Sequence, residues 1–134
     1  MDDSINLETF MRIFKNKWFS RFARKEGISD EALLEAVMSI AAGNYDADLG
    51  AGVYKQRIAR PGEDQSGGYR VILCFQAGHM SFFVYGFPKS AKANITPDEK
   101  KTFRKLAKFL LAVTPDKLEA MLRHGDLDEI MHER

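Results

Sequence analysis

The chain has 134 residues, of which 45% are hydrophobic and 29% charged, and this composition fits one globular domain. The net charge of +1 excludes a strong overall field that would draw the protein to nucleic acid or acidic membranes, so any functional charge is local. The single cysteine, Cys74, excludes an internal disulfide and argues against a thiolate metal site. Because the start is polar and no apolar run is long, we expect a cytoplasmic protein without a membrane segment.

The first third of the chain predicts a short strand followed by a helical hairpin. Residues 10–14 alternate in the manner of a strand, although neither face is cleanly polar. Apolar residues recur at helical spacing from Trp18 to Phe22, and Gly27 is a natural stop for this helix. Ser29 is a typical N-terminal cap for a second helix, which ends near Gly43.

The middle of the chain predicts a meander of strands. Residues 45–52 contain Gly and Asp and indicate a loop. The strand-like runs that follow are Val53–Arg60, Tyr69–Gln76 and His79–Phe87. The link at 61–68 is polar and rich in Gly, which is typical of a long hairpin loop.

The last part of the chain predicts two more helices. Residues 96–99, Thr-Pro-Asp-Glu, have the pattern of a capping box with Pro in the first turn, and the helix is expected to run to about Val113. A second Thr-Pro pair at 114–115 starts a short helix that stops near Gly125.

The predicted order of elements is β-α-α-β-β-β-α-α, which indicates an α+β domain. We expect one domain over residues 1–134, with a core of about residues 10–113 and a short C-terminal helix and tail at 114–134. An antiparallel sheet of about four strands would carry the helices on one face and leave the other face free to bind a ligand.

Basic residues gather on this sheet. Between residues 51 and 92, six Lys and Arg side chains stand against two acidic ones. Lys55 and Arg57 alternate on one strand, so they project from the same face about 7 Å apart, and Arg70 begins the neighbouring strand. Further cations follow at strand ends: Arg60, Lys89 and Lys92. We therefore expect cations from separate stretches of chain to meet over one end of the sheet.

Such a cluster has the groups needed to cleave RNA through its 2′-hydroxyl. Arginine provides forked donors for a phosphate, and a lysine among other cations loses its proton more readily. Tyr54 and Tyr85 are candidates for stacking on unpaired bases. The sequence leaves a simpler alternative open, in which the cations only increase solubility and Tyr85 belongs to the core. No Walker loop, zinc spacing or Ser-His-Asp set is present, so we expect neither metal nor cofactor.

Three strings of the sequence carry more specific motifs. YKQRIARPGEDQSGGYRVILCF is followed by FFVYGFPKSAKANI, and FKNKWFSRFARKEGIS stands near the start. They resemble the RelE-type toxins of the RelE/ParE superfamily, in the branch with an R-I-A-R-P-G … S-G-G-Y-R motif and then Y-G-F-x-K. The resemblance covers roughly residues 13–122.

The resemblance implies a compact fold like that of the microbial ribonucleases, and a toxin that inhibits translation by cleaving mRNA, usually on the ribosome. The implied partners are mRNA, the ribosome and a cognate antitoxin, which we expect to carry a helix-turn-helix domain. By position, the catalytic residues would be Lys55, Arg57, Arg70 and Lys89. Lys92 also matches a basic residue of the family, and we expect it to bind RNA together with Arg60, Tyr54 and Tyr85, which are candidates from the residues alone.

Two positions depart from the family pattern. Ser90 stands where many relatives have Arg, and Ile95 stands where they have a Tyr that stacks on a base. Two alternatives therefore stay open. One is an inhibitor without nuclease activity, like the ParE branch that acts on DNA gyrase, and the other is an interaction domain whose catalytic function has decayed.

Overall fold

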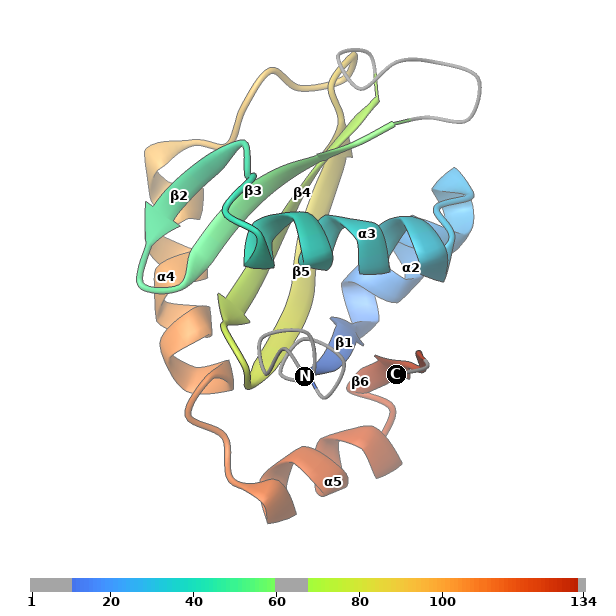
Figure 1. Ribbon diagram of the computed structural model, residues 1–134, viewed down its shortest axis with the longest axis vertical. Coiled ribbons are helices and arrows are strands. Elements are labelled where there is room, and N and C mark those ends of the chain that lie inside the picture. Colours follow the sequence, from blue (N-terminus) through green and yellow to red (C-terminus); the bar gives the residue numbers. More distant parts are fainter. Residues whose placement is uncertain (1–10, 60–67, 133–134) are drawn as a thin grey trace, which may run out of the picture.

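The computed structural model describes residues 11–59 and 68–132, and these form a mixed sheet with helices on both of its faces (Figure 1). The strands are β1 (Arg12–Asn16), β2 (Ala47–Gly50), β3 (Val53–Ile58), β4 (Tyr69–Gln76), β5 (Met80–Pro88) and β6 (Leu127–Ile130). The helices are α2 (Lys17–Glu26), α3 (Asp30–Ala41), α4 (Pro97–Leu110) and α5 (Pro115–Arg123). The described strands make one sheet of six in the order β2-β3-β4-β5-β1-β6, and the expected α+β class is confirmed.

The helices begin where the sequence predicts because their capping side chains are in place. Ser29 accepts the backbone N–H of Ala32 at the start of α3. At the start of α4, the Glu99 N–H donates to Thr96 Oγ1 at 3.1 Å and the Thr96 N–H donates to Glu99 Oε1 at 2.7 Å, which completes the predicted capping box. Gly27 ends α2 in the left-handed conformation, with φ of 71°.

Helix α4 ends at Leu110, earlier than the expected Val113. The N–H groups of Ala112 and Val113 donate to the carbonyls of Phe109 and Leu110, three residues back rather than four. This tightening of the last turn takes the chain out of the helix before Thr114 starts α5.

The sheet contains strands that the sequence analysis did not predict. Residues expected as a loop form β2, which pairs antiparallel with β3, and residues expected as a tail form β6, which pairs antiparallel with β1. Leu127 and Ile130 of β6 are each 2% exposed, so this end of the chain belongs to the core. Both strands have only four residues, which is too short to show a clear alternation.

Strand β1 lies inside the sheet and runs parallel to β5, with Ile13 opposite Ser81 and Phe14 opposite Phe82. The sheet is therefore mixed rather than wholly antiparallel. The helical hairpin α2–α3 and the strands β2 to β4 all lie between β1 and β5 in the sequence, and a connection of this length is what parallel pairing requires.

Helices cover both faces of the sheet, so the expectation of one uncovered face is wrong. α2 and α3 pack on one face, where Phe19 and Phe83 are buried, while α4 and α5 pack on the other, where Phe82 and Leu110 are buried. Residues Val71–Phe75 of β4 are apolar and buried throughout. A strand that is apolar on both sides has to be covered on both sides. No described helix is both long enough and apolar enough to cross a membrane.

An irregularity in the sheet decides which way two aromatic side chains point. Leu73 of β4 is paired with Phe83 of β5, but the next residue, Ile72, is paired with Tyr85, so Val84 is an extra residue on β5. Such a bulge changes the face to which the following side chains project. Tyr85 and, two residues later, Phe87 consequently lie on the α4 face of the sheet.

Candidate active site

The predicted cations Lys55, Arg57 and Arg70 lie together at one end of the α4 face. In the register of β3 and β4, Arg57 is directly opposite Arg70, and Lys55 is directly opposite Ile72. Side chains two residues apart on a strand share a face, so Lys55 lies on the same face as both arginines. The predicted juxtaposition of these side chains is confirmed. We call Lys55, Arg57 and Arg70 the cation cluster.

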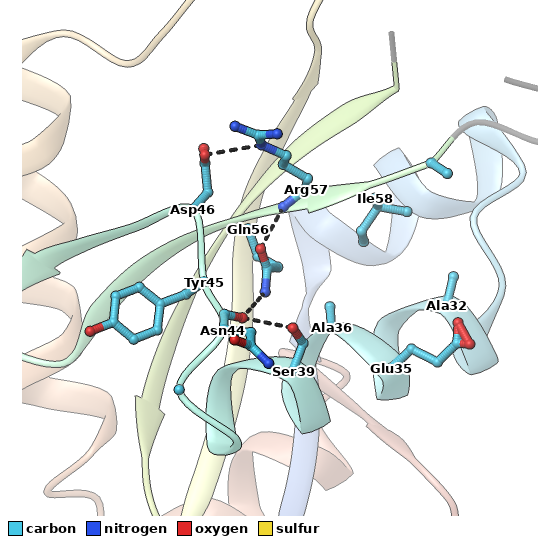
Figure 2. A pocket seen from close by; sticks show the side chains of 12 residues that line it. Ala32, Glu35, Ala36, Ser39, Asn44, Tyr45, Asp46, Gln56, Arg57 and Ile58 are labelled. Carbon is cyan, nitrogen blue, oxygen red and sulfur yellow. Dashed lines mark hydrogen bonds and ion pairs between the residues drawn. The ribbon is translucent and has the colours of Figure 1, made fainter. Parts of the chain in front are cut away.

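The cation cluster is gathered around the carboxylate of Asp46, which comes from the loop between α3 and β2. Asp46 Oδ1 accepts a hydrogen bond from Arg57 Nε at 3.1 Å (Figure 2). Asp46 Oδ2 lies 3.5 Å from Lys55 Nζ and 3.7 Å from Arg70 Nε. The Asp46, Lys55 and Arg70 side chains are 12%, 16% and 7% exposed, so the two ion pairs among them are poorly screened by water, whereas the Arg57 side chain is 48% exposed.

The loop that carries Asp46 is fixed on both sides of the carboxylate. The Asn44 carbonyl accepts hydrogen bonds from Ser39 Oγ at 2.6 Å and from Gln56 Nε2 at 2.8 Å (Figure 2). The Asp46 N–H donates to the carbonyl of Lys55 at 3.1 Å. The carboxylate is thus held from α3 and β3 at once, and the sequence analysis missed it because this stretch resembled an ordinary loop.

A second charged pair borders the cation cluster. Lys92 Nζ donates to both carboxylate oxygens of Glu99 at 2.6 and 2.7 Å, and it lies 5.4 and 5.7 Å from the ring centres of Tyr85 and Phe87. The hydrogen bond to Glu99 is the main cause that raises the pKa of Lys92, and the same bond lowers the pKa of Glu99. Lys92 therefore stays charged but is neutralised locally by Glu99.

Paired arginines and a lysine around one carboxylate make a site that suits an anion such as a phosphodiester. Comparison with known protein families matches residues 11–130 to the RelE toxin of the RelE/RelB toxin-antitoxin system. The chain belongs to the RelE toxin family. No curated protein and no solved structure matches it in the corresponding searches. The expected family membership is confirmed, and RelE toxins are the toxin components of toxin-antitoxin systems.

The other residues predicted for the RelE site lie in different places. Lys89 is exposed just after Pro88, and its N–H donates to the Gly68 carbonyl, so it stands at the same end of the sheet as the cation cluster. Tyr85 packs between Trp18 and Phe103, with ring centres 4.8 and 5.4 Å away. Its ring belongs to the edge of the core while its hydroxyl faces Lys92. The roles of these residues stay predictions.

Tyr54 does not share the face of the cation cluster. It packs on the α3 face, with its ring centre 5.1 Å from that of Tyr45 and 5.6 Å from that of Phe75. The strand period explains this, because Tyr54 is one residue from Lys55 and so points to the opposite side. A base that stacked on Tyr54 would lie across the sheet from the cation cluster. Arg60, the remaining candidate, lies outside the described residues.

Asn94 is a further residue that the sequence analysis missed. Its side-chain oxygen accepts a hydrogen bond from Lys55 Nζ at 3.2 Å and another from the Ile95 N–H at 2.9 Å. Ile95 itself packs against the core beside α4. Ile95 is thus used for packing, while its neighbour Asn94 holds Lys55.

A hollow of about 580 Å³ opens beside the cation cluster, between α3 and the edge of β3 (Figure 2). β2 pairs with β3 only as far as Lys55, so none of the described strands lies beside this edge of β3 at Arg57 and Ile58. Asp46 and Arg57 stand at the margin where the hollow meets the cation cluster. Among the described residues, no group of His, Cys, Asp and Glu side chains is arranged to hold a metal ion.

Proposed function

We propose that this RelE toxin is an endoribonuclease that inhibits translation by cleaving mRNA on the ribosome. The observation that carries the proposal is the meeting of Lys55, Arg57 and Arg70 at one end of the α4 face of the sheet. Two guanidinium groups and an ammonium within reach of one point provide the positive charge that a scissile phosphodiester requires.

The burial of Arg70 supports a role beyond solubility. Arg70 is only 6% exposed, whereas a cation that serves solubility extends into water. Placing a guanidinium in such surroundings costs free energy, which nearby anions offset only in part. The simpler alternative of a solvated basic face therefore fits Arg70 poorly.

The proposed reaction is attack of the 2′-hydroxyl on the adjacent phosphorus. The 2′-oxygen forms a bond to phosphorus as its proton leaves to a base, and the bond from phosphorus to the 5′-oxygen breaks as that oxygen takes a proton. Arg57 and Arg70 would stabilise the extra negative charge on the phosphate, and Lys55 and Lys89 are the candidates for proton transfer. The products are a 2′,3′-cyclic phosphate and a 5′-hydroxyl end, so the reaction needs no oxidant or cofactor.

The proposed partners follow from the same site. Tyr85 and Lys92 border the cation cluster and would contact the RNA beside the scissile phosphate. Family membership implies an antitoxin partner, for which we propose a protein with a helix-turn-helix domain. Its binding would keep the cation cluster from ribosome-bound message.

The test is a translation reaction with purified ribosomes, a labelled message and purified toxin, read by primer extension. The expected result is a set of cuts within the translated region, with cyclic phosphate ends. Arg57→Ala should abolish the cuts, while Arg24→Ala, an exposed arginine on α2, should leave them intact. Intact message together with inhibition of DNA gyrase supercoiling would favour the ParE-like alternative instead, and intact message without any inhibition would favour a decayed domain.

A further inference from the structure

An acidic side chain, Asp46, lies at the centre of a cluster that we propose binds an anion, and its role there needs an explanation. We propose that Asp46 is a positioning residue, which holds Lys55, Arg57 and Arg70 as one phosphate-binding unit without itself contacting the substrate. This inference rests on the proposed nuclease function.

The first argument is electrostatic. Arg57 and Arg70 are direct cross-strand partners, and like charges in that position repel each other. Lys55 adds a third positive charge on the same face. An anion at the centre of the group offsets this repulsion, and Asp46 is within 3.7 Å of a nitrogen of each member. Asp46→Asn would remove this compensation, while Lys55 would keep its hydrogen bond to Asn94.

The second argument is the way in which Asp46 approaches the arginines. It contacts Arg57 and Arg70 through their Nε atoms, at 3.1 and 3.7 Å, which lie on one side of each guanidinium group. Figure 2 shows the Arg57 Nε joined to Asp46, and among the described residues no hydrogen bond or ion pair involves the terminal nitrogens of Arg57. Asp46 can therefore orient Arg57 while these terminal nitrogens bind a phosphate.

The third argument is that Asp46 is itself held. Its loop is anchored at the Asn44 carbonyl by Ser39 and Gln56, and at its own N–H by the Lys55 carbonyl. A group that served only to occupy the phosphate position until RNA arrived would have to move away. A fixed carboxylate that contacts Nε atoms is better suited to alignment than to displacement.

The experiment compares Asp46→Asn with Asp48→Asn. Asp48 is exposed on β2, and its Oδ1 accepts the Gly50 N–H, which an asparagine can also do, so this control removes the same charge two residues away. We would measure the single-turnover cleavage rate with saturating toxin, and the Kd for an RNA with a 2′-deoxy nucleotide at the cleavage position. The expected result for Asp46→Asn is a rate lowered on the order of 10²-fold with a Kd that is unchanged or lower. Asp48→Asn should match the wild type.

This split between rate and affinity separates positioning from the alternatives. A residue needed only for folding would weaken both quantities, and thermal unfolding would show it. A residue that merely occupied the phosphate position would, when neutralised, give tighter binding with cleavage at least as fast as the wild type, and that result would overturn the proposal.

A second variant covers the case in which Asp46→Asn folds poorly. Ser39→Ala removes one of the two hydrogen bonds to the Asn44 carbonyl without touching the cation cluster, and it should slow cleavage in the same direction by a smaller factor. An unchanged rate in Ser39→Ala beside an unstable Asp46→Asn would also count against positioning.

One further measurement distinguishes failure of this inference from failure of the proposed nuclease. Proton exchange at Nε–Hε of Arg57, which donates to Asp46 Oδ1, should be slow in the wild type and faster in Asp46→Asn when followed by NMR. If the wild type does not cleave RNA, the nuclease proposal fails, and slow exchange then supports Asp46 as an anchor while fast exchange overturns that as well. If the wild type cleaves and Asp46→Asn cleaves equally well, only the role of Asp46 is overturned.

Discussion

The two ends of the α4 face are built on the same strands and differ in the side chains that they carry. On β4, Ile72 and Cys74 are both 0% exposed beneath α4, while Arg70 at the other end contributes to the cation cluster. On β3, Val53 is buried at the end under α4, and the Arg57 side chain is 48% exposed at the other. Helix α4 packs on one end of this face, which we call the covered end, and the other end carries the cation cluster, so we call it the chemical end. Each end should respond to mutation in its own way.

The largest effect should come from the covered end. Phe82 is fully buried and stacks on Phe14, with ring centres 5.1 Å apart. Phe82→Ala would leave a cavity there, and we expect the free energy of unfolding to fall by about 3–5 kcal/mol. Urea unfolding followed by circular dichroism measures it. The cleavage rate per folded molecule should stay near that of the wild type, and a rate that fell in proportion to stability would break the division between the two ends.

The next effect belongs to the chemical end. Arg70→Ala should lower the cleavage rate about 10²–10³-fold, because a donor to the phosphate is lost. Arg70→Lys keeps the charge but not the forked donor, and it should recover only part of the rate. Lys108→Ala, which removes an exposed charge from α4 near the covered end, is the control and should cleave normally. Equal losses in Arg70→Ala and Lys108→Ala would indicate that general positive charge, rather than the cation cluster, matters.

A third effect depends on pH and concerns a buried thiol at the covered end. Burial raises the pKa of Cys74 to about 12 from an ordinary value of 9.0. Above pH 9 the unfolded chain releases the thiol proton while the folded protein retains it, so stability falls as pH rises towards 12. The slope contributed by one group is up to about 1.4 kcal/mol per pH unit.

The Cys74 contribution is measured as a difference between the wild type and Cys74→Ala, because other groups titrate in the same range. Urea unfolding between pH 8 and pH 10.5 should show the wild type losing stability more steeply than Cys74→Ala. Parallel slopes would mean that the thiol ionises as readily in the folded protein as in the unfolded chain. The folded wild type should also react slowly with a thiol reagent at neutral pH.

The smallest effect lies at the boundary between the two ends. Thr96→Ala removes the side-chain cap of α4, and we expect a loss of about 1 kcal/mol in the free energy of unfolding. The partner of Thr96 in the capping box is Glu99, which also holds Lys92, so a small loss of RNA affinity should accompany the loss of stability. Thermal unfolding and RNA binding measure the two. An unchanged RNA affinity in Thr96→Ala would show that the Lys92–Glu99 ion pair forms without the Thr96 cap.

Local chemistry explains why much of the fold was predictable. The caps at Ser29 and Thr96 and the stop at Gly27 act within a few residues, so the helices they bound appear in the sequence. Strands β3 to β5 have six to nine residues, which is long enough for their apolar and β-branched residues to predict a strand. β2 and β6 are not, because a four-residue strand is defined by its partner in the sheet.

The candidate site was predictable only where it depends on strand alternation. The placing of Lys55, Arg57 and Arg70 on one face follows from a period of two and from pairing across a hairpin. The same alternation places Tyr54 on the opposite face from Lys55, so it could have excluded Tyr54 from the predicted site. Asp46 could not be predicted, because its place opposite the cation cluster depends on the packing of a loop between α3 and β2.

What the sequence determined by itself is therefore local: the helices, the central strands, the family and the face on which the basic residues stand. The tertiary structure decided that α4 and α5 cover the face opposite α2 and α3, that a bulge turns Tyr85 towards Lys92, and that Asp46 joins the cation cluster. The physical reason is the distance along the chain over which each interaction acts. Capping and alternation act between neighbours in the chain, whereas covering, register and ion pairing depend on segments that meet only after folding.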